Sequence, residues 1–238
     1  MISSKSFVLN HFRVAGALVI SISIALVFAA KAEEATESSV SAVSADAAKA
    51  RLQQGNRRCV EGRSAHKHDL ARWRERFLVK QQPFATVLGC SDSRVPPEFV
   101  FDQGFGQLFV IRVAGNIVDP AVIASIQYSI EHLENKLIIV LGHQNCGAVT
   151  AALASPNQTK NEPKELRNLL DRIRPAITTV DRRSEHEHRV AIAVEANARA
   201  SAKQLREVPS IAAAIRTKHV KVVAAIDNVA TGTVTFLE

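Results

Sequence analysis

The chain has 238 residues, 47% of them hydrophobic, which is enough for one sizeable core and fits one domain better than two. Its formal net charge of +7 includes three basic side chains within the first 32 residues, where no acidic side chain occurs. No run of lysine and arginine with interleaved aromatic residues is present, so the composition gives nucleic-acid binding little support. The mild basicity is better explained as a solubility feature.

The first 32 residues have the pattern of a secretory signal peptide. Lys5 and Arg13 precede an apolar run from Val14 to Phe28, and a small-residue cleavage pattern follows at 30–32. The alternative is a transmembrane anchor, but the run of about 15–17 residues is shorter than the ~20 that a spanning helix needs. We therefore predict a signal peptide at 1–32, export to the periplasm and no membrane attachment after cleavage. An uncleaved, membrane-tethered form is the other possibility.

The mature chain is predicted to start with a flexible leader and two helices. Residues 33–45 are small, polar and acidic, a composition typical of an unstructured leader. From Asp46 a helical pattern runs to a plausible stop at Gly55-Asn56, and a second amphipathic stretch covers 68–79. Neither helix has a sheet of its own to cover. We therefore expect this N-terminal helical arm, residues 46–82, to lie on a partner subunit.

The single domain predicted at 46–238 alternates strands with helices after this arm. Short apolar runs indicate the strands, and apolar residues at helical spacing indicate the helices between them. Strands are predicted at 85–89, 108–113, 137–141, 220–226 and, at an edge, 233–237; helices start near Pro96, Asp119 and Cys146 and cover 166–177 and 191–205. This order implies an α/β fold with a mainly parallel central β-sheet flanked by helices on both faces.

Two of the predicted strands are followed by metal-ligating side chains. A Cys-x-Asp-x-Arg motif begins at Cys90, and a His-x-x-Cys motif runs from His143 to Cys146. The carboxyl ends of strands in one open α/β sheet lie at the edge where such sheets place their ligands. Two thiolates and one imidazole suit Zn²⁺, so we predict one zinc per chain with its fourth position open for catalysis. The alternative is a Cys90–Cys146 disulfide in an oxidising compartment.

Three further residues are predicted to serve the chemistry of this site. Zinc bound there would lower the pKa of a water and supply hydroxide near neutral pH. Asp92 is close enough to accept a hydrogen bond from that water, and Arg94 is placed to hold the carboxylate ionised and off the metal. The N–H of Gly147, at a helix start, is placed to assist with an oxygen. Two alternatives remain: Asp92–Arg94 is only a structural ion pair, or Asp92 itself takes the fourth zinc position.

A Cys-Ser-Asp-Ser-Arg run at 90–94 followed by His-x-x-Cys-Gly at 143–147 is similar to the zinc site of β-class carbonic anhydrases. The similarity runs from about residue 47 to 237 and includes Phe-Asp-Gln-Gly at 101–104 and Arg-Val-Ala-Gly-Asn at 112–116. The resemblance implies an α/β fold, an N-terminal arm wrapped over the partner subunit, and an obligate homodimer that can pair into a dimer-based tetramer.

The same resemblance implies an enzyme, a carbonate dehydratase of the lyase class. Its expected reaction is the zinc-dependent, reversible hydration of CO₂ to bicarbonate and a proton by zinc-bound hydroxide. Gln81, in a Gln-x-Pro sequence nine residues before Cys90, is implied as a polar group of the substrate pocket. In family members of one type, the residue that matches Asp92 occupies the metal at low pH and leaves it as the pH rises.

Three other functions remain open at this point. Relatives on the same fold hydrolyse carbon disulfide or carbonyl sulfide with the same zinc ligands. A non-catalytic zinc protein that serves assembly is the second, although the intact Asp92–Arg94 pair argues against it. A thiol redox protein is the third, and it predicts an oxidised Cys90–Cys146 pair without zinc. The His and Glu residues at 185–188 are expected on a solvated surface, and Cys59 is expected to be a packed core thiol.

Overall fold

The computed structural model describes residues 43–65, 79–181, 183 and 185–237. The predicted signal peptide at 1–32 and nearly all of the predicted leader at 33–45 lie outside these residues, as does the second predicted helix at 68–79 apart from its last residue. Within the described part of the chain, no helix is both long enough and apolar enough to cross a membrane.

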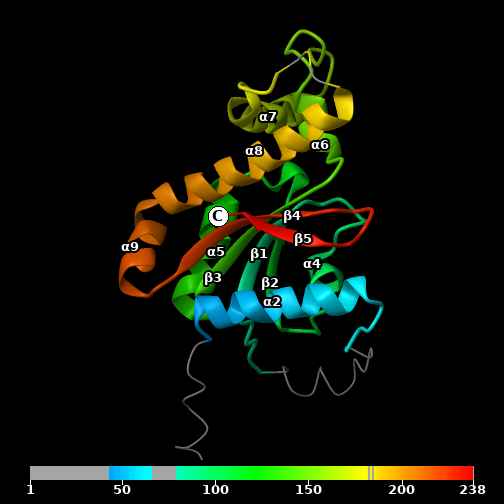
Figure 1. Cartoon of the computed structure of the whole chain (residues 1–238). Coiled ribbons are helices and arrows are strands. Elements are labelled where there is room, and N and C mark those ends of the chain that lie inside the picture. Colours follow the sequence, from blue (N-terminus) through cyan, green and yellow to red (C-terminus); the bar gives the residue numbers. More distant parts are fainter. Residues whose placement is uncertain (1–42, 66–78, 182, 184, 238) are drawn as a thin grey trace, which may run out of the picture. The chain divides into compact units, whose positions relative to one another are not determined.

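The core of the protein is a five-stranded sheet with the strand order β2-β1-β3-β4-β5 (Figure 1). Four strands run parallel, and β5 pairs antiparallel with β4. The strands are β1 (Ala85–Gly89), β2 (Leu108–Arg112), β3 (Leu137–His143), β4 (Lys221–Asp227) and β5 (Val234–Leu237). The predicted α/β class with a mainly parallel sheet is confirmed, and β3 extends two residues beyond its predicted end.

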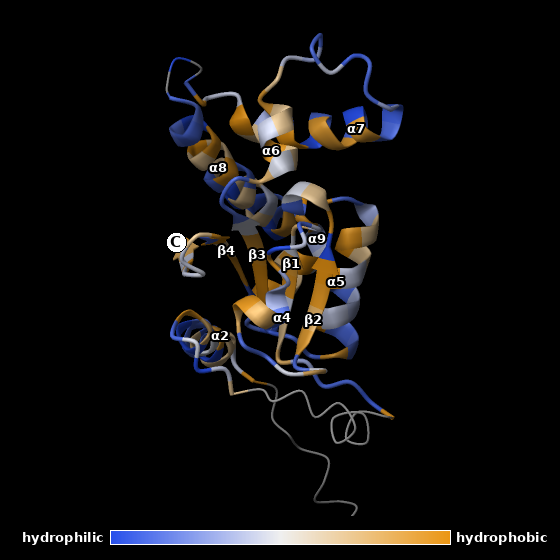
Figure 2. Cartoon of the chain, turned by 90° about the vertical axis from the view of Figure 1, so that its right-hand side faces the viewer, coloured by the Kyte–Doolittle hydropathy of each residue, from blue (hydrophilic) through white to orange (hydrophobic). Residues whose placement is uncertain are grey.

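Helices cover both faces of the sheet, and Figure 2 shows hydrophobic strands enclosed between them. Every residue of β1 and β3 is buried, as expected for strands with both faces covered. The helices are α2 (Ala45–Val60), α4 (Pro97–Val100), α5 (Pro120–His132), α6 (Gly147–Ala152), α7 (Lys164–Ile173), α8 (His186–Glu207) and α9 (Pro209–Thr217), with 3₁₀ turns η1 (Ala114–Asn116) and η2 (Arg174–Ile177). The predicted start of α5 is confirmed: Asp119 caps it by accepting a hydrogen bond from the N–H of Val122 at 2.8 Å, and Pro follows in the first turn.

The alternation of side chains along β3 divides the core into two clusters. Ile138 and Val140 point to one face, where they pack with apolar residues of α5, α9 and the C-terminal half of α8. Leu137, Ile139 and Leu141 point to the other face, where the cluster includes residues of α2, α6, α7 and the N-terminal half of α8. The long helix α8 therefore contributes to both halves of the core.

The helix α2 covers the protein's own sheet, so the expectation that it lacks one is wrong. Ala48 and Leu52 are fully buried and belong to the same cluster as Ala85 and Val87 of β1. The sequence pattern gave the apolar stripe of this helix correctly, but such a stripe carries no information about which surface it covers. The first of the two helices of the predicted arm therefore packs on its own chain.

The predicted stop of this helix at Gly55-Asn56 is also wrong, because both residues are used for packing instead. A Cβ on Gly55 would lie 1.8 Å from the Phe101 carbonyl oxygen, so only glycine permits this approach to the end of α4. The buried Asn56 side chain donates to the carbonyl oxygens of Val100 and Gly232, at 2.9 and 2.7 Å. Its amide therefore joins distant segments and leaves the helix free to continue to Val60.

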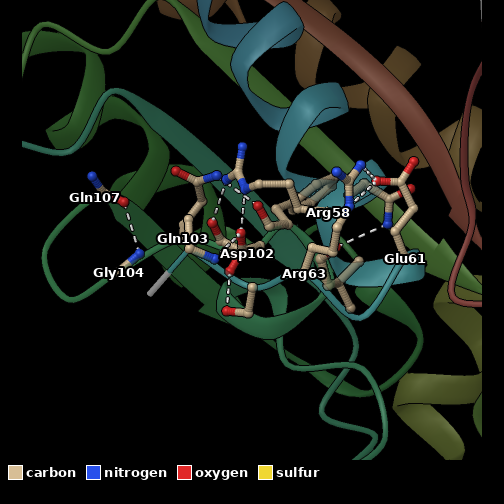
Figure 3. A network of polar contacts seen from close by, with 12 residues as sticks. Arg58, Glu61, Arg63, Asp102, Gln103, Gly104 and Gln107 are labelled. Carbon is tan, nitrogen blue, oxygen red and sulfur yellow. Dashed lines mark hydrogen bonds and ion pairs between the residues drawn. The ribbon is translucent and has the colours of Figure 1, made fainter. Parts of the chain in front are cut away.

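A network of polar contacts ties the end of α2 to the turn after α4 (Figure 3). The Asp102 carboxylate is buried and accepts hydrogen bonds from Arg58 Nε at 2.5 Å, Ser64 Oγ at 2.6 Å and the Ala65 N–H at 3.1 Å. Burial raises the pKa of Asp102, but the hydrogen bonds from Ser64, Ala65 and Arg58 outweigh it, so the pKa lies below its ordinary value. Asp102 is therefore an ionised, Arg-paired carboxylate on the chain segment that leads from β1 to β2.

Replacing Asp102 with asparagine is expected to lower the free energy of unfolding at neutral pH by about 2 kcal/mol, because charge-assisted hydrogen bonds to a buried group are lost. A carboxylate whose pKa is lower in the folded state stabilises the fold above its unfolded pKa and loses that contribution as the pH falls through the folded pKa. The difference between wild type and Asp102→Asn should therefore narrow below about pH 4 in urea unfolding at a series of pH values. A difference that stays constant into acid would contradict this account.

Candidate metal centre

The predicted metal ligands meet at the carboxyl ends of two adjacent strands. Cys90 directly follows β1, His143 is the last residue of β3, and Cys146 immediately precedes α6. Because β1 and β3 pair in parallel, their ends lie at the same edge of the sheet. The three ligand atoms lie within 4.8 Å of one another, and all three residues are buried. The structure thus brings together the ligand set that the sequence predicted.

The imidazole of His143 is oriented as a metal ligand. Its Nδ1 lies 3.1 Å from the backbone carbonyl oxygen of Gln144, so Nδ1 carries the proton and donates it in a hydrogen bond. Nε2 then carries the free lone pair, and this buried atom has no hydrogen-bond partner. An orphaned, buried nitrogen beside two thiols is what a soft or borderline cation such as Zn²⁺ would satisfy.

Cys90 and Cys146 are free thiols, so the alternative of a Cys90–Cys146 disulfide is not found in the structure. Their Sγ atoms lie 3.9 Å apart, far beyond the ~2 Å of a disulfide bond. The hydrogen bond between the two thiols lowers the pKa of Cys90 and raises the pKa of Cys146. A cation bound at the site would favour the thiolate form of both ligands and displace their protons.

Backbone and side-chain donors hold the segment around Cys90 in place. The N–H of Gly115, in η1, donates to Cys90 Sγ at 3.3 Å, and the guanidinium of Arg112, at the end of β2, donates to the Cys90 carbonyl at 2.9 Å. Arg112 also donates to the carbonyl oxygen of Asp92 at 2.5 Å. Both residues belong to the Arg-Val-Ala-Gly-Asn stretch that begins at the end of a predicted strand, but the sequence gives no indication of these contacts.

Asp92 lies beside the ligand cluster and is clasped by Arg94. Arg94 Nε and Nη2 donate to the two carboxylate oxygens at 2.9 and 2.7 Å, and the Arg94 N–H adds a third bond at 3.0 Å. The Arg94 hydrogen bond holds the pKa of Asp92 well below its ordinary value. Asp92 Oδ2 lies 3.9 Å from His143 Nε2, and the side chain is 18% exposed. The carboxylate is thus ionised, next to the metal ligands and within reach of solvent, as the predicted role of Asp92 and Arg94 requires.

The two remaining predicted site residues lie at different places. Gly147 is the first residue of α6, next to the ligand Cys146, and a Cβ there would meet nothing within 4 Å. Gln81 is exposed and precedes the amino end of β1, whereas Cys90 follows its carboxyl end. The structure therefore does not bring Gln81 to the metal ligands of its own chain. Its place in a substrate pocket, like the role of the Gly147 N–H, stays a prediction.

One neighbour of the ligands carries no sequence signal at all. Asp227 pairs with His143 across β3 and β4, and its buried Oδ1 has no hydrogen-bond partner. Burial raises its pKa. The residues at 185–188 are exposed, as predicted, and they form no metal-ligand group in the described part of the chain.

A comparison with protein families identifies the site. The family model for carbonic anhydrase matches residues 85–234, which hold all three ligands, Asp92 and Arg94. The chain belongs to the carbonic anhydrase family. Solved structures of β-class members place it in that class, as the resemblance of its motifs indicated.

The relatives show how far the likeness extends. Carbonic anhydrase 2 of Mycobacterium tuberculosis is 43% identical over 126 residues, which are 53% of this chain and 61% of the relative. A carbonic anhydrase of Mycolicibacterium smegmatis is 41% identical over 126 residues, again 53% of this chain and 61% of the relative. This carbonic anhydrase homologue thus matches about three fifths of the length of these curated relatives. A tetrameric β-carbonic anhydrase of Sordaria macrospora superposes with a TM-score of 0.65 at 26% identity, covering 71% of this chain and 88% of the other. The structure of the Coccomyxa β-carbonic anhydrase in complex with acetazolamide superposes with a TM-score of 0.65 at 27% sequence identity. The match covers 78% of this chain and 84% of the other.

Proposed function

We propose that this protein catalyses the zinc-dependent, reversible hydration of CO₂ to bicarbonate and a proton. The observation that carries the proposal is the buried cluster of two thiols and one unpartnered imidazole nitrogen, with an ionised Asp92 held beside it. The relatives that share this stretch of sequence bear the name carbonic anhydrase, which supports the same reaction for this chain.

The ligand residues fit one zinc ion per chain. Cys90 and Cys146 offer thiolates and His143 offers Nε2, which makes three protein ligands of the kind that leaves a catalytic zinc with an open position. Zinc bound there supplies Lewis acidity that lowers the pKa of a water toward neutrality. Two thiolates donate more negative charge than imidazoles do, so the water needs help from a neighbouring group.

Asp92 is the group that gives this help. Its Oδ2 lies close to the ligand cluster, so a water there can donate a hydrogen bond to the carboxylate. Such a bond would orient the water so that an oxygen lone pair can attack the carbon of CO₂. The bond that forms is C–O, one C=O π bond of CO₂ becomes a C–O⁻ single bond, and the water passes one proton to solvent or buffer in the overall reaction.

Arg94 and Arg112 keep Asp92 in this position. The bidentate contact of Arg94 engages both carboxylate oxygens and keeps the group ionised. Arg112 fixes the backbone on which Asp92 stands by donating to its carbonyl. Since the Arg94 side chain is 52% exposed, the Asp92–Arg94 pair borders solvent, which favours catalysis over a closed, purely structural zinc site.

Assembly and location complete the proposal. We infer a homodimer, or a tetramer built from dimers, because the related Sordaria macrospora enzymes are tetrameric. We infer export to the periplasm from the signal-peptide pattern of residues 1–32, with no attachment to the membrane after cleavage.

Stopped-flow measurement of CO₂ hydration by the zinc-loaded mature protein, from neutral to alkaline pH, tests the reaction. Fast hydration with one zinc per chain is the expected result. A rate that appears only toward the alkaline end would add that Asp92 occupies the metal at low pH. A zinc-loaded protein that fails with CO₂ but hydrolyses carbonyl sulfide or carbon disulfide would overturn the proposed substrate, and one that acts on none of them would point to an assembly role.

A further inference from the structure

A buried asparagine on α8 is connected to the thiolate of Cys90 through the backbone of Gly115. Asn197 Nδ2 donates to the Gly115 carbonyl oxygen at 2.8 Å, and the N–H of Gly115 donates to Cys90 Sγ at 3.3 Å. Both hydrogen bonds are buried, and Asn197 lies 82 residues beyond Gly115 in the sequence. The outer support of one metal ligand therefore comes from a different layer of the fold than the ligand itself.

The geometry of Gly115 makes this connection a stiff one. Its carbonyl belongs to the peptide that it shares with Asn116, and that peptide is held at both ends: Asn197 binds the oxygen, and the Asn116 N–H donates to the Val113 carbonyl at 2.9 Å. The N–H of Gly115 belongs to the preceding peptide group, which Gly115 shares with Ala114. Only the φ and ψ torsions of Gly115 lie between the two peptide groups. Fixing the Gly115–Asn116 peptide therefore also fixes the direction in which the Gly115 N–H points.

The conformation of Gly115 leaves little freedom for substitution. Its φ of +68° lies in the left-handed region that favours glycine. An added Cβ would also lie 2.7 Å from Cδ1 of Ile173 and 3.3 Å from Cβ of Ala148. The side chain at this position cannot support the site, so the support has to come from a neighbour, and Asn197 is the neighbour that provides it.

We propose that Asn197 is a positioning residue of the metal centre, which aims the Gly115 N–H at Cys90 Sγ and thereby sets the orientation and electron donation of this thiolate ligand. An N–H directed at a thiolate withdraws charge from sulfur, and outer partners of metal ligands commonly change metal affinity by about 10- to 100-fold. The inference rests on the proposed metal site, but not on which substrate is turned over.

The substitution Asn197→Leu tests this role, because leucine has the same branching and number of side-chain heavy atoms as asparagine but cannot donate a hydrogen bond. In the cobalt-substituted protein, the sulfur-to-cobalt charge-transfer absorption should move to lower energy, since a thiolate that has lost an N–H donor gives up its electrons more easily. Zinc affinity, measured by competition with a chelator, should fall about tenfold. A charge-transfer band at the wild-type energy would overturn the proposal.

Asn135→Leu is the matched control. Asn135 is as buried as Asn197, and its side chain also donates one hydrogen bond, to Thr86 Oγ1 at 3.0 Å. It lies just before the amino end of β3, however, whereas His143 lies at the carboxyl end of that strand. Both variants lose a buried hydrogen bond and some stability to unfolding, but only Asn197→Leu should change the absorption. An equal shift in both would show that the effect is general loosening and would refute the assignment.

A measurement on the unaltered protein covers the case in which Asn197→Leu does not fold. With an NMR-active cadmium isotope in place of zinc, the Gly115 amide proton should show a scalar coupling to the metal through the thiolate, and its absence would overturn the proposal. Failure of the wild type to bind any of these metals would refute the metal site itself. Metal binding with these signatures but without CO₂ hydration would refute only the proposed reaction.

Discussion

Replacing His143 with alanine is expected to abolish zinc binding and CO₂ hydration together. The imidazole is fully buried and contributes the one ligand nitrogen of the cluster, with Nδ1 already engaged by the Gln144 carbonyl. Without it only two thiol ligands remain, one fewer than the three protein ligands of a catalytic zinc site. Zinc affinity should fall by more than the roughly 100-fold that the loss of an outer-shell partner costs. Metal analysis after dialysis and stopped-flow hydration measure the two effects.

The substitution Cys59→Ser is the control for this prediction. Cys59 is a free thiol on α2, only partly buried, and it is not one of the clustered ligands. We expect it to retain one zinc per chain and full activity, whereas Cys90→Ser should behave like His143→Ala. An active, zinc-loaded His143→Ala protein would show that the metal is held elsewhere.

Replacing Asp92 with asparagine is expected to leave zinc bound and to lower turnover by about 100-fold or more, the scale on which proton-accepting groups act. The amide keeps the shape of the side chain but turns an ionised acceptor into a weaker, neutral one. It also breaks one arm of the contact with Arg94, because an NH₂ group cannot accept from the guanidinium. The three ligands themselves are untouched, so metal content should not change.

Asp102→Asn is the matched control for Asp92→Asn. Asp102 is likewise an ionised carboxylate paired with an arginine, Arg58, but it lies in the network between α2 and α4 and not among the metal ligands. This control should lose stability and keep turnover per zinc-loaded molecule. Full turnover by Asp92→Asn would remove the role assigned to that carboxylate, and an equal loss in both variants would attribute the effect to the fold.

The metal ligands could be predicted from the sequence because their motifs come at the ends of two short apolar runs bounded by glycine, which indicate buried strands. Cys90 and His143 meet since β1 and β3 are neighbours in the sheet, and a parallel sheet brings the carboxyl ends of its strands to one edge. The Asp92–Arg94 contact could also be predicted, because residues two apart in a turn can reach each other. Contacts between residues close in the sequence were therefore predictable from local patterns.

The parts that could not be predicted depend on packing between distant segments. The apolar stripe of α2 was visible in the sequence, but its position on the protein's own sheet was not. The local pattern predicts a helix stop at Asn56, because its bridge to Val100 and Gly232 exists only in the folded chain. Asn197 gave no signal, because an asparagine within a helical pattern does not disclose a backbone carbonyl 82 residues away.

Adding zinc stepwise to the metal-free protein while following CO₂ hydration tests the central claim most directly. If Cys90, His143 and Cys146 hold the catalytic zinc, the rate should rise in proportion to the metal added and level off at one zinc per chain. Hydration faster than the uncatalysed rate before any zinc is added would contradict this claim. So would a site that fills with zinc while the rate stays at the uncatalysed level.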